Sequence, residues 1–283
     1  MKWESTVVQK VLFRFVKQAI SIARKLTDAA LMQMSHPAGN GGAGWKHAVL
    51  HFLRLHMEAT LEEVSDWGEE MERVRAAFIL ERGEFPGPPA LCKSFDRAPM
   101  RIWRELLRRS SELLDQNGYA EIDATYFDRR QASNHYRKQC DREIQTVQAT
   151  FLVDTAQGAV IDVHRSAKWP SGTTIGPQVA RRNAGDLLRL AADKGYDDMS
   201  FREALRAEGV RPLIKHRVFA PYDHAHNARI EDERYNHRSV CEPVNSVIKR
   251  SDGGAVRARV WYRQLREITL AATVYSIEQA VKQ

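Results

Sequence analysis

The chain has 283 residues, of which 43% are hydrophobic, so it can bury a core and is not a wholly disordered protein. Its 43 Lys and Arg residues outnumber 36 Asp and Glu, and the formal net charge of +7 favours a polyanionic partner. Nucleic acid is the first such partner and an anionic membrane surface the second, although the same balance also fits a mildly basic soluble enzyme.

The sequence gives no sign of membrane insertion or of a disulfide framework. Lys10, Arg14 and Lys17 interrupt the N-terminal apolar run, so it lacks the core of a signal peptide, and no transmembrane helix is expected. The three cysteines are far apart and odd in number, which fits neither a set of disulfides nor a Cys-x-x-Cys zinc site. We therefore expect a cytoplasmic protein with free thiols and no membrane partner.

The first third of the chain reads as helices separated by Gly- and Pro-rich breakers. Apolar residues recur at helical spacing in two runs that flank the breaker at residues 36–45. Thr60 is placed to cap a third helix, with Glu63 as its capping-box partner. Residues 99–114 are strongly helical and carry four arginines, Arg101, Arg104, Arg108 and Arg109. They could belong to a helix-turn-helix that enters DNA grooves, or to the solvated face of a plain helical subdomain.

After Gly118 the pattern changes to strands. Residues 119–127 alternate as a strand, and 146–154 and 159–164 flank a turn, so we expect a three-stranded antiparallel meander. The remaining elements follow in order: a helix at 175–183, a strand at 187–192, a helix at 200–208, a strand at 211–215 and a long helix at 256–281. These elements predict an α/β domain at 118–283, preceded by an all-α domain at 1–117.

Three acidic residues stand out in the α/β part. Asp123 lies mid-strand on the face that also carries Glu121 and Thr125, where a buried carboxylate without a partner is costly. Asp193 follows an apolar run and opens the segment DKGYDD, so we expect it at a strand end that faces a cleft. Glu242 lies in YNHRSVCEPVNSVIK, residues 235–249.

If the fold gathers these acids, a cation or a proton must lie between them. Two unit charges 4 Å apart repel by about 4 kcal/mol at an effective dielectric constant near 20. An all-oxygen site suits Mg²⁺, and two such ions would activate a water or a 3′-hydroxyl and stabilise the leaving oxygen.

Tyr235, Arg238, Glu242 and Lys249 are spaced by three, four and seven residues. On one continuous helix they would fall within roughly 60° of one another and form a phosphate-handling face. Pro243 complicates this arrangement, because it biases Glu242 away from helical geometry. Either Pro243 takes the first helical position with Glu242 just before it, or the helix is kinked there.

Plainer interpretations stay open for each part. Asp123 could face solvent, DKGYDD could be an ordinary turn, and 235–249 could be an ion-paired helix face. If the register is shifted, the alternative ligands are Asp128, Asp197 and Asp198.

The histidines His216, His224, His226 and His237 lack a supporting metal motif and are expected to be loop residues. Trp169 could stack on an unpaired base or anchor its loop. A basic cluster could face DNA or solvent: Arg129, Arg130, Arg137, Lys138 and Arg142.

The order IDATYF, ADKGYD and Y-x2-R-x3-E-x6-K resembles the DDE transposases of bacterial and archaeal insertion sequences, in the subclass named for its Tyr-Arg-Glu-Lys signature. The resemblance covers roughly residues 118–275. It implies an RNase H-like mixed sheet flanked by helices, and two divalent cations, Mg²⁺ with Mn²⁺ able to substitute. It also implies that Asp123, Asp193 and Glu242 are the catalytic and metal-binding residues. Arg238 and Lys249 match positions that touch DNA phosphates, and Tyr235 matches a supporting position nearby.

The expected function is therefore a transposase that cuts DNA at insertion-sequence ends and joins the freed 3′-hydroxyl to target DNA. Its partners would be double-stranded DNA, both terminal inverted repeats and target, with the helical N-terminal region on the repeats and at least two protomers in the assembly. Two rivals remain: a non-catalytic DNA-binding regulator derived from a transposase, and an RNase H-like nuclease that hydrolyses without joining.

Overall fold

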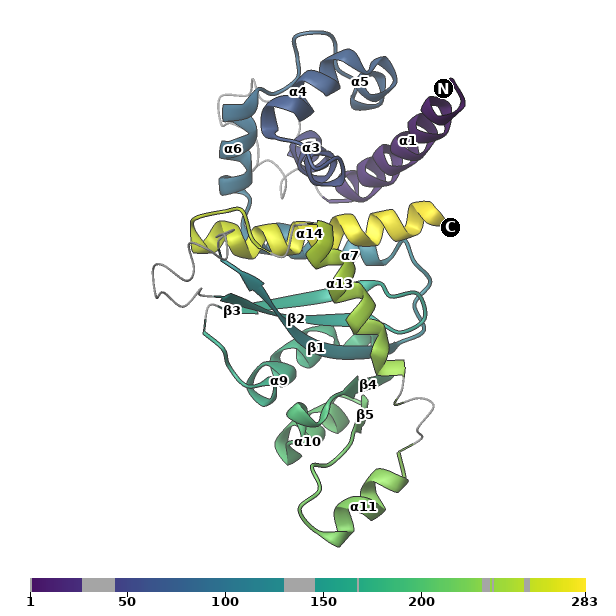
Figure 1. Cartoon of the computed structure of the whole chain (residues 1–283), viewed down its shortest axis with the longest axis vertical. Coiled ribbons are helices and arrows are strands. Elements are labelled where there is room, and N and C mark those ends of the chain that lie inside the picture. The colour runs from purple at the N-terminus through teal and green to yellow at the C-terminus, as the bar shows by residue number, and fades with distance from the viewer. Residues whose placement is uncertain are drawn as a thin grey trace. The chain divides into compact units, whose positions relative to one another are not determined.

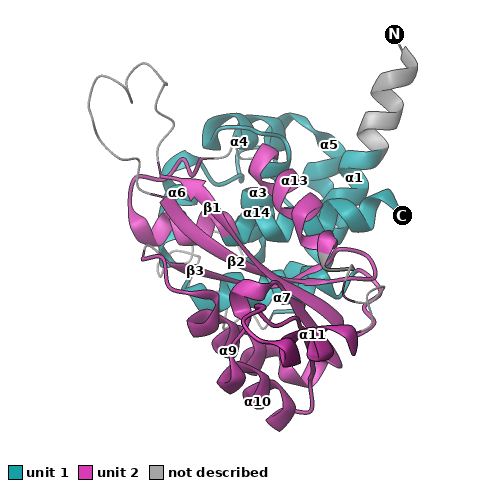
Figure 2. Ribbon diagram, turned by 60° about the horizontal axis from the view of Figure 1, so that its bottom comes forward, with its two compact units in different colours: residues 1–113, 269–283 teal, residues 114–268 magenta. Residues whose placement is uncertain are grey.

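The computed structural model describes residues 2–26, 44–129, 146–166, 168–230, 235, 237–251 and 255–283. The chain divides into two compact units (Figure 2). Unit 1 comprises Met1–Leu113 with Thr269–Gln283, and unit 2 comprises Leu114–Ile268. The functional domains expected at 1–117 and 118–283 stay a prediction, because compactness does not say what each part binds.

Unit 1 is helical, as its apolar periodicity predicts. Its helices are α1 (Lys2–Arg24), α3 (Gly44–His56), α4 (Leu61–Glu70), α5 (Glu72–Phe78), α6 (Pro88–Arg97), α7 (Met100–Ser111) and the C-terminal part of α14 (Trp261–Lys282). Aromatic and aliphatic side chains fill its core, among them Phe15, Leu50, Phe52, Phe78 and Trp103. No helix in the described ranges is both long enough and apolar enough to cross a bilayer.

The predicted capping box at the start of α4 is confirmed. The hydroxyl of Thr60 accepts a hydrogen bond from the Glu63 amide at 3.2 Å, and the Glu63 carboxylate accepts one from the Thr60 amide at 2.7 Å. Both bonds satisfy amides that have no partner inside the helix, which fixes where α4 begins.

The arginines of α7 are partly engaged within their own helix. Arg108 and Arg109 each form ion pairs with Glu105 and Glu112, at 2.6 to 3.1 Å. These are pairs three and four residues apart on a partly exposed surface, each worth only a few tenths of a kcal/mol, about 0.2–0.5. They lower the local positive charge that a DNA-reading helix would offer, whereas Arg101 on the same helix is exposed.

Unit 2 is built on a five-stranded mixed sheet in the order β3-β2-β1-β4-β5 (Figure 1). The strands are β1 (Tyr119–Asp128), β2 (Thr146–Asp154), β3 (Val160–Ser166), β4 (Arg189–Ala192) and β5 (Arg211–Ile214). β1, β2 and β3 form an antiparallel meander, while β4 and β5 run parallel to β1. The predicted mixed sheet, preceded by helices, is confirmed.

The two faces of β1 meet different helices. Ile122 belongs to a buried cluster with residues of α9 (Gly172–Asn183) and α10 (Met199–Ala207), including Val179 and Phe201. Glu121 and Asp123 point the other way, because neighbouring strand residues face opposite sides, and both bond to α13 (Cys241–Ser251). Figure 1 shows α9 and α10 on one side of the sheet and α13 crossing its other side.

Shorter elements complete unit 2. They are the 3₁₀ helices η2 (Ala184–Asp186), η3 (Lys194–Tyr196) and η4 (His237–Val240), and the helix α11 (Pro221–Ala228).

The last helix, α14, begins at Trp261 and not at Val256 as predicted. The carboxylate of Glu267 accepts hydrogen bonds from the Arg257 and Ala258 amides at 3.2 and 2.9 Å, and these bonds hold the preceding segment outside the helix.

Candidate active site

Asp123 and Asp193 follow paired positions on neighbouring parallel strands. The last residue pair between β1 and β4 is Ile122 with Ala192, and each aspartate is the next residue of its chain. Adjacent strands lie about 4.8 Å apart, so this register brings the two aspartates to the same level of the sheet. Burial raises the pKa of the Tyr196 phenol, and the charges of Asp123 and Asp193 raise it further, which places both carboxylates within electrostatic reach of one ring.

Asp193 also organises the turn that follows β4. It is the residue just before η3, and its Oδ1 accepts a hydrogen bond from the Gly195 amide at 2.9 Å. A Cβ at Gly195 would lie 2.8 Å from that same Oδ1, so a larger residue there would displace the Asp193 carboxylate. Asp193 lies at a strand end, as predicted, and its side chain is exposed.

Helix α13 runs alongside β1 in the same direction. Three interactions in chain order show this. The Cys241 amide donates to Glu121 Oε2 at 2.8 Å, Asn245 Nδ2 donates to Asp123 Oδ2 at 3.2 Å, and Lys249 Nζ lies 5.8 Å from the centre of the Phe127 ring. The first two interactions place Glu242 beside Asp123.

The predicted single helix over residues 235–249 is wrong. The chain forms the 3₁₀ helix η4 up to Val240 and becomes α-helical only at Cys241. Pro243 therefore lies in the first turn of α13, where its missing N–H costs no intrahelical hydrogen bond. Glu242 is itself inside the helix, so the alternative that puts Pro243 at the first helical position is not the one observed.

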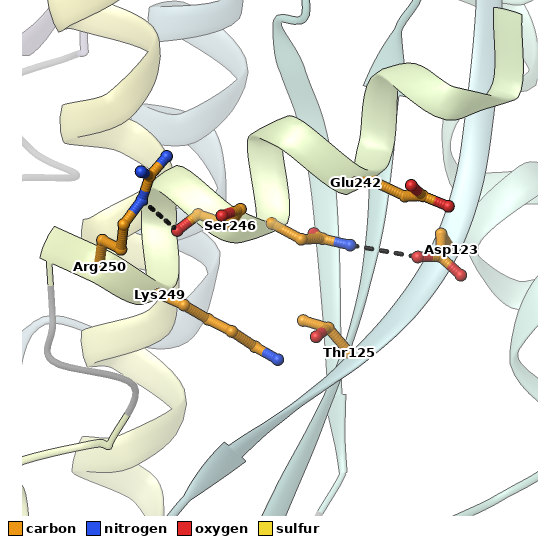
Figure 3. Close-up of a pocket in the computed structure, with 7 residues that line it drawn as sticks. Asp123, Thr125, Glu242, Ser246, Lys249 and Arg250 are labelled. Atoms are coloured by element: carbon orange, nitrogen blue, oxygen red, sulfur yellow. Dashed lines mark hydrogen bonds between the residues drawn. The ribbon is translucent and has the colours of Figure 1, made fainter.

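A pocket of about 650 Å³ lies between β1 and α13 (Figure 3). Its lining residues are Asp123, Thr125, Glu242, Asn245, Ser246, Lys249 and Arg250. Glu242, Asn245, Ser246 and Lys249 follow the spacing i, i+3, i+4, i+7, which puts them on one helix face. Figure 3 shows Asp123 and Glu242 at one end of the pocket and Lys249 and Arg250 toward the other.

The structure thus brings together three of the six predicted site residues in one pocket: Asp123, Glu242 and Lys249. Asp193 is on the adjacent strand end and is not among the lining residues. Tyr235 is only 4% exposed, and the Lys215 ammonium lies over its ring at 4.4 Å. Arg238 belongs to η4, but its side chain is outside the described part of the structure.

Negative charge gathers where α13 begins. Burial raises the pKa of the Cys241 thiol well above its ordinary range, and the nearby carboxylates of Glu121, Asp123 and Glu242 contribute to the same shift. A buried thiol in this field stays protonated and is a poor nucleophile. Lys249 and Arg250 carry the opposite charge two helical turns further on, about 10 Å along the axis.

The donor chemistry of the pocket fits a hard divalent cation. Two carboxylates, two hydroxyls and an amide line it, and Mg²⁺ and Mn²⁺ prefer oxygen ligands. Among the described residues, no three His, Cys, Asp or Glu side chains are grouped closely enough to hold a metal ion. The assignment of Asp123, Asp193 and Glu242 as joint metal ligands stays a prediction.

Two of the three alternative ligands, Asp197 and Asp198, are engaged elsewhere. Asp197 pairs with Arg202 at 2.7 Å, and Asp198 accepts a hydrogen bond from the Phe201 amide at 3.0 Å to cap α10. His216 contacts Asp223 at 2.9 Å and stacks on His226, with ring centres 3.6 Å apart.

Two other sequence observations have different outcomes. Trp169 is 61% exposed, so its ring is not buried as a loop anchor. In the basic cluster, Arg129 bonds Gln264 at 3.0 Å, and the other four residues, Arg130, Arg137, Lys138 and Arg142, lie outside the described residues.

Sequence reasoning missed Asn245, Ser246, Arg250 and the role of Glu121. The signal for the first two was the helical spacing from Glu242 to Lys249, which continues through both positions. Glu121 was placed on the face of Asp123, but nothing local indicated that it bonds to a residue 120 positions away.

Comparison with known proteins identifies the family. A family model described as "Transposase DDE domain" matches residues 120–277, more than half of the chain. No curated protein sequence matches. Among solved structures, a chain of the simian T-cell lymphotropic virus intasome in complex with PP2A regulatory subunit B56 gamma is 13% identical and has a TM-score of 0.34. The match covers 54% of this chain and 47% of that one, so this chain spans about half of its length.

A second solved structure is the piggyBac transposase synaptic complex with hairpin DNA. It is 9% identical with a TM-score of 0.44, over 95% of this chain and 73% of that one. At these TM-scores the likeness says nothing about function, and the assignment rests on the sequence match. The chain belongs to the transposase DDE-domain family.

Proposed function

We propose that the protein is a metal-dependent DNA transposase that cuts at the ends of an insertion sequence and joins the freed 3′-hydroxyl to target DNA. The observation that carries this proposal is the pocket between β1 and α13. It has two carboxylates at one end and two cationic side chains at the other. That arrangement suits a DNA strand. A cation held by the carboxylates would act on the reacting phosphodiester, and the cationic side chains would bind the neighbouring phosphates.

Each residue has a distinct part in this scheme. Asp123, Asp193 and Glu242 would hold two divalent ions, Mg²⁺ or Mn²⁺. When bound, these ions would act as Lewis acids on the attacking and leaving oxygens. Lys249 and Arg250 would bind the phosphates beside the cleaved bond, with Arg238 as a further phosphate contact. Tyr235 would support the site from its buried position.

The partners follow from the reaction. The substrate is double-stranded DNA, both the terminal inverted repeats and the target site, and the net charge of +7 favours its binding. The helical region 1–117 would bind the inverted repeats. Because two ends must be joined to one target, activity would require an assembly of at least two protomers on DNA.

Cleavage of a plasmid that carries the DNA flanking the gene tests the proposal. The wild-type protein should nick or cut this plasmid with Mg²⁺ or Mn²⁺, and Glu242→Gln should abolish cleavage while DNA binding stays near wild type. Glu203→Gln, an exposed glutamate on α10, is the matched control and should cut normally. A Glu242→Gln protein that cuts at the original rate would remove Glu242 from the mechanism.

The same assay separates the rivals. Strand joining distinguishes a transposase from a nuclease, which would release ends without transferring them. A protein that binds the end sequence tightly but never cuts it with either cation would be a regulator.

A further inference from the structure

Asn245 is the pocket residue whose hydrogen-bonding capacity is only half used. It is 6% exposed and lines the pocket from the second turn of α13. Its Nδ2 donates to Asp123 Oδ2 at 3.2 Å, but its buried Oδ1 has no hydrogen-bond partner among the residues that the structure describes. Buried side-chain oxygens are nearly always satisfied, so an unsatisfied one in a pocket indicates a ligand that the protein atoms do not supply.

The orientation of this amide follows from chemistry. An ionised carboxylate only accepts hydrogen bonds, so the nitrogen of Asn245 must face Asp123 and the carbonyl oxygen must face away from it. Turning the amide over would set two acceptors against each other. The residue that carries this oxygen lines the same pocket as Asp123 and Glu242.

The position of Asn245 on α13 favours the same conclusion. It follows Glu242 by three residues, so both side chains lie on one helix face. Amide carbonyls are regular ligands of hard divalent cations beside carboxylates.

We propose that Asn245 is a cation-binding residue: its Oδ1 contributes an oxygen ligand to the divalent cation that Asp123 and Glu242 bind, and its Nδ2 orients Asp123 for the same ion. This inference rests on the proposed function, since it assigns a further ligand to that site. If Asn245 only joined α13 to β1 through its amide, its removal would not change the affinity of the site for the cation.

Binding of Mn²⁺ to the full chain, followed by electron paramagnetic resonance without DNA, tests the assignment. Asn245→Ala should weaken Mn²⁺ binding by about tenfold or more, as removal of metal-site residues commonly does. Asp123→Asn should weaken it at least as much. Asn245→Ala with wild-type affinity, beside a defective Asp123→Asn, would overturn the inference while leaving the proposed function intact.

Thermal unfolding of Asn245→Asp gives a second readout. The new carboxylate would repel Asp123, so its melting temperature without metal should fall below that of the wild type. Mn²⁺ should then raise it by more than it raises the wild type, because the cation sits between the two charges.

Asn183→Asp is the matched control. Asn183 is also buried and donates to an aspartate, Asp162, at 3.1 Å, but that pair is on α9 and β3, away from the pocket. Its variant should lose stability without any extra gain from Mn²⁺. An Asn245→Asp protein whose Mn²⁺-induced shift is no larger than that of Asn183→Asp would contradict the proposal. Absence of Mn²⁺ binding by the wild type would overturn this inference together with the metal site on which it rests.

Discussion

The carboxylate of Glu121 accepts a hydrogen bond from the backbone amide of Cys241 at 2.8 Å, and this bond fastens the start of α13 to β1. Both residues are buried, with Glu121 5% exposed and Cys241 fully covered. A negative charge at a helix N-terminus is favoured by the helix dipole, and here it also satisfies one of the orphan amides of the first turn. Asp123 follows Glu121 by two residues, and Glu242 follows Cys241 by one. This hydrogen bond therefore fixes how Asp123 and Glu242 lie relative to each other.

Loss of the Glu121 carboxylate should therefore reduce stability and cleavage together. Glu121→Ala leaves the Cys241 amide without a partner, and we expect unfolding free energy to fall by about 1–3 kcal/mol. Cleavage should fall further than the unfolded fraction explains, because Glu242 is no longer held beside Asp123. Urea denaturation and plasmid cleavage measure the two effects.

Glu121→Gln serves as the conservative comparison, since its amide oxygen can still accept the bond from Cys241. It should recover much of the stability and the cleavage rate. If Glu121→Ala cut DNA at a normal rate once corrected for stability, the carboxylate would have no positioning role.

The packing of α9 against α10 predicts a stability loss from one added methyl group. A Cβ at Gly176 would lie 2.8 Å from the ring of Phe201, which is fully buried. Overpacking of this kind costs about 1–3 kcal/mol, only partly offset by the better helix propensity of alanine. Gly176→Ala should thus lower the urea midpoint. Gly185→Ala, where no atom lies within 4 Å of the added Cβ, should leave it nearly unchanged. Equal midpoints for the two variants would refute this account of the core.

Asp223 should make stability depend on acid pH. Hydrogen bonds from the Phe219 and Ala220 amides, and then His216, lower the pKa of Asp223 from 3.8 to about 2. Because the folded pKa lies below the unfolded one, its stabilisation is complete above about pH 4 and is lost as pH falls toward 2. Asp223→Asn should remove this contribution.

Urea denaturation at pH 5 and pH 3 measures the effect of Asp223. The variant should be less stable than the wild type at pH 5, and the difference should shrink at pH 3. Asp186→Asn, an exposed aspartate of η2, is the control and should change neither value. A difference of constant size at both pH values would contradict the assignment.

Lys249 should contribute to the salt dependence of DNA binding. Each phosphate neutralised by a cationic side chain adds about 0.9 to the slope of log affinity against log salt on duplex DNA. Lys249→Ala should lower that slope by about this amount, measured by fluorescence anisotropy between low and physiological salt. Lys282→Ala, exposed near the C-terminus, should leave it unchanged. An unaltered slope for Lys249→Ala would exclude a phosphate contact.

Local pattern was sufficient to predict most of the fold. The apolar run 146–154 before a turn predicts β2 with the bounds observed, and the capping pair Thr60 and Glu63 is present as expected. Asp193 was also correctly placed at a strand end, because an apolar run followed by a glycine turn is a local signal.

Features that depend on distant residues were not predictable from the sequence. The start of α13 is held by Glu121, and the late start of α14 follows from the bonds between Glu267 and the segment before it. Asn245 looked like an ordinary helix residue until the fold put it beside Asp123. In each case the deciding partner is fixed only by tertiary structure.

The central claim is that Asp123, Asp193 and Glu242 act at one cation site, and cleavage of end-sequence DNA by Asp193→Asn tests it most directly, since Asp193 is the acid outside the pocket lining. We predict that the wild type and Asp186→Asn cut with Mg²⁺ or Mn²⁺ but not with EDTA, and that Asp193→Asn falls to the EDTA background while still binding DNA. Wild-type cleavage by Asp193→Asn, or cutting by the wild type in EDTA, would contradict the account.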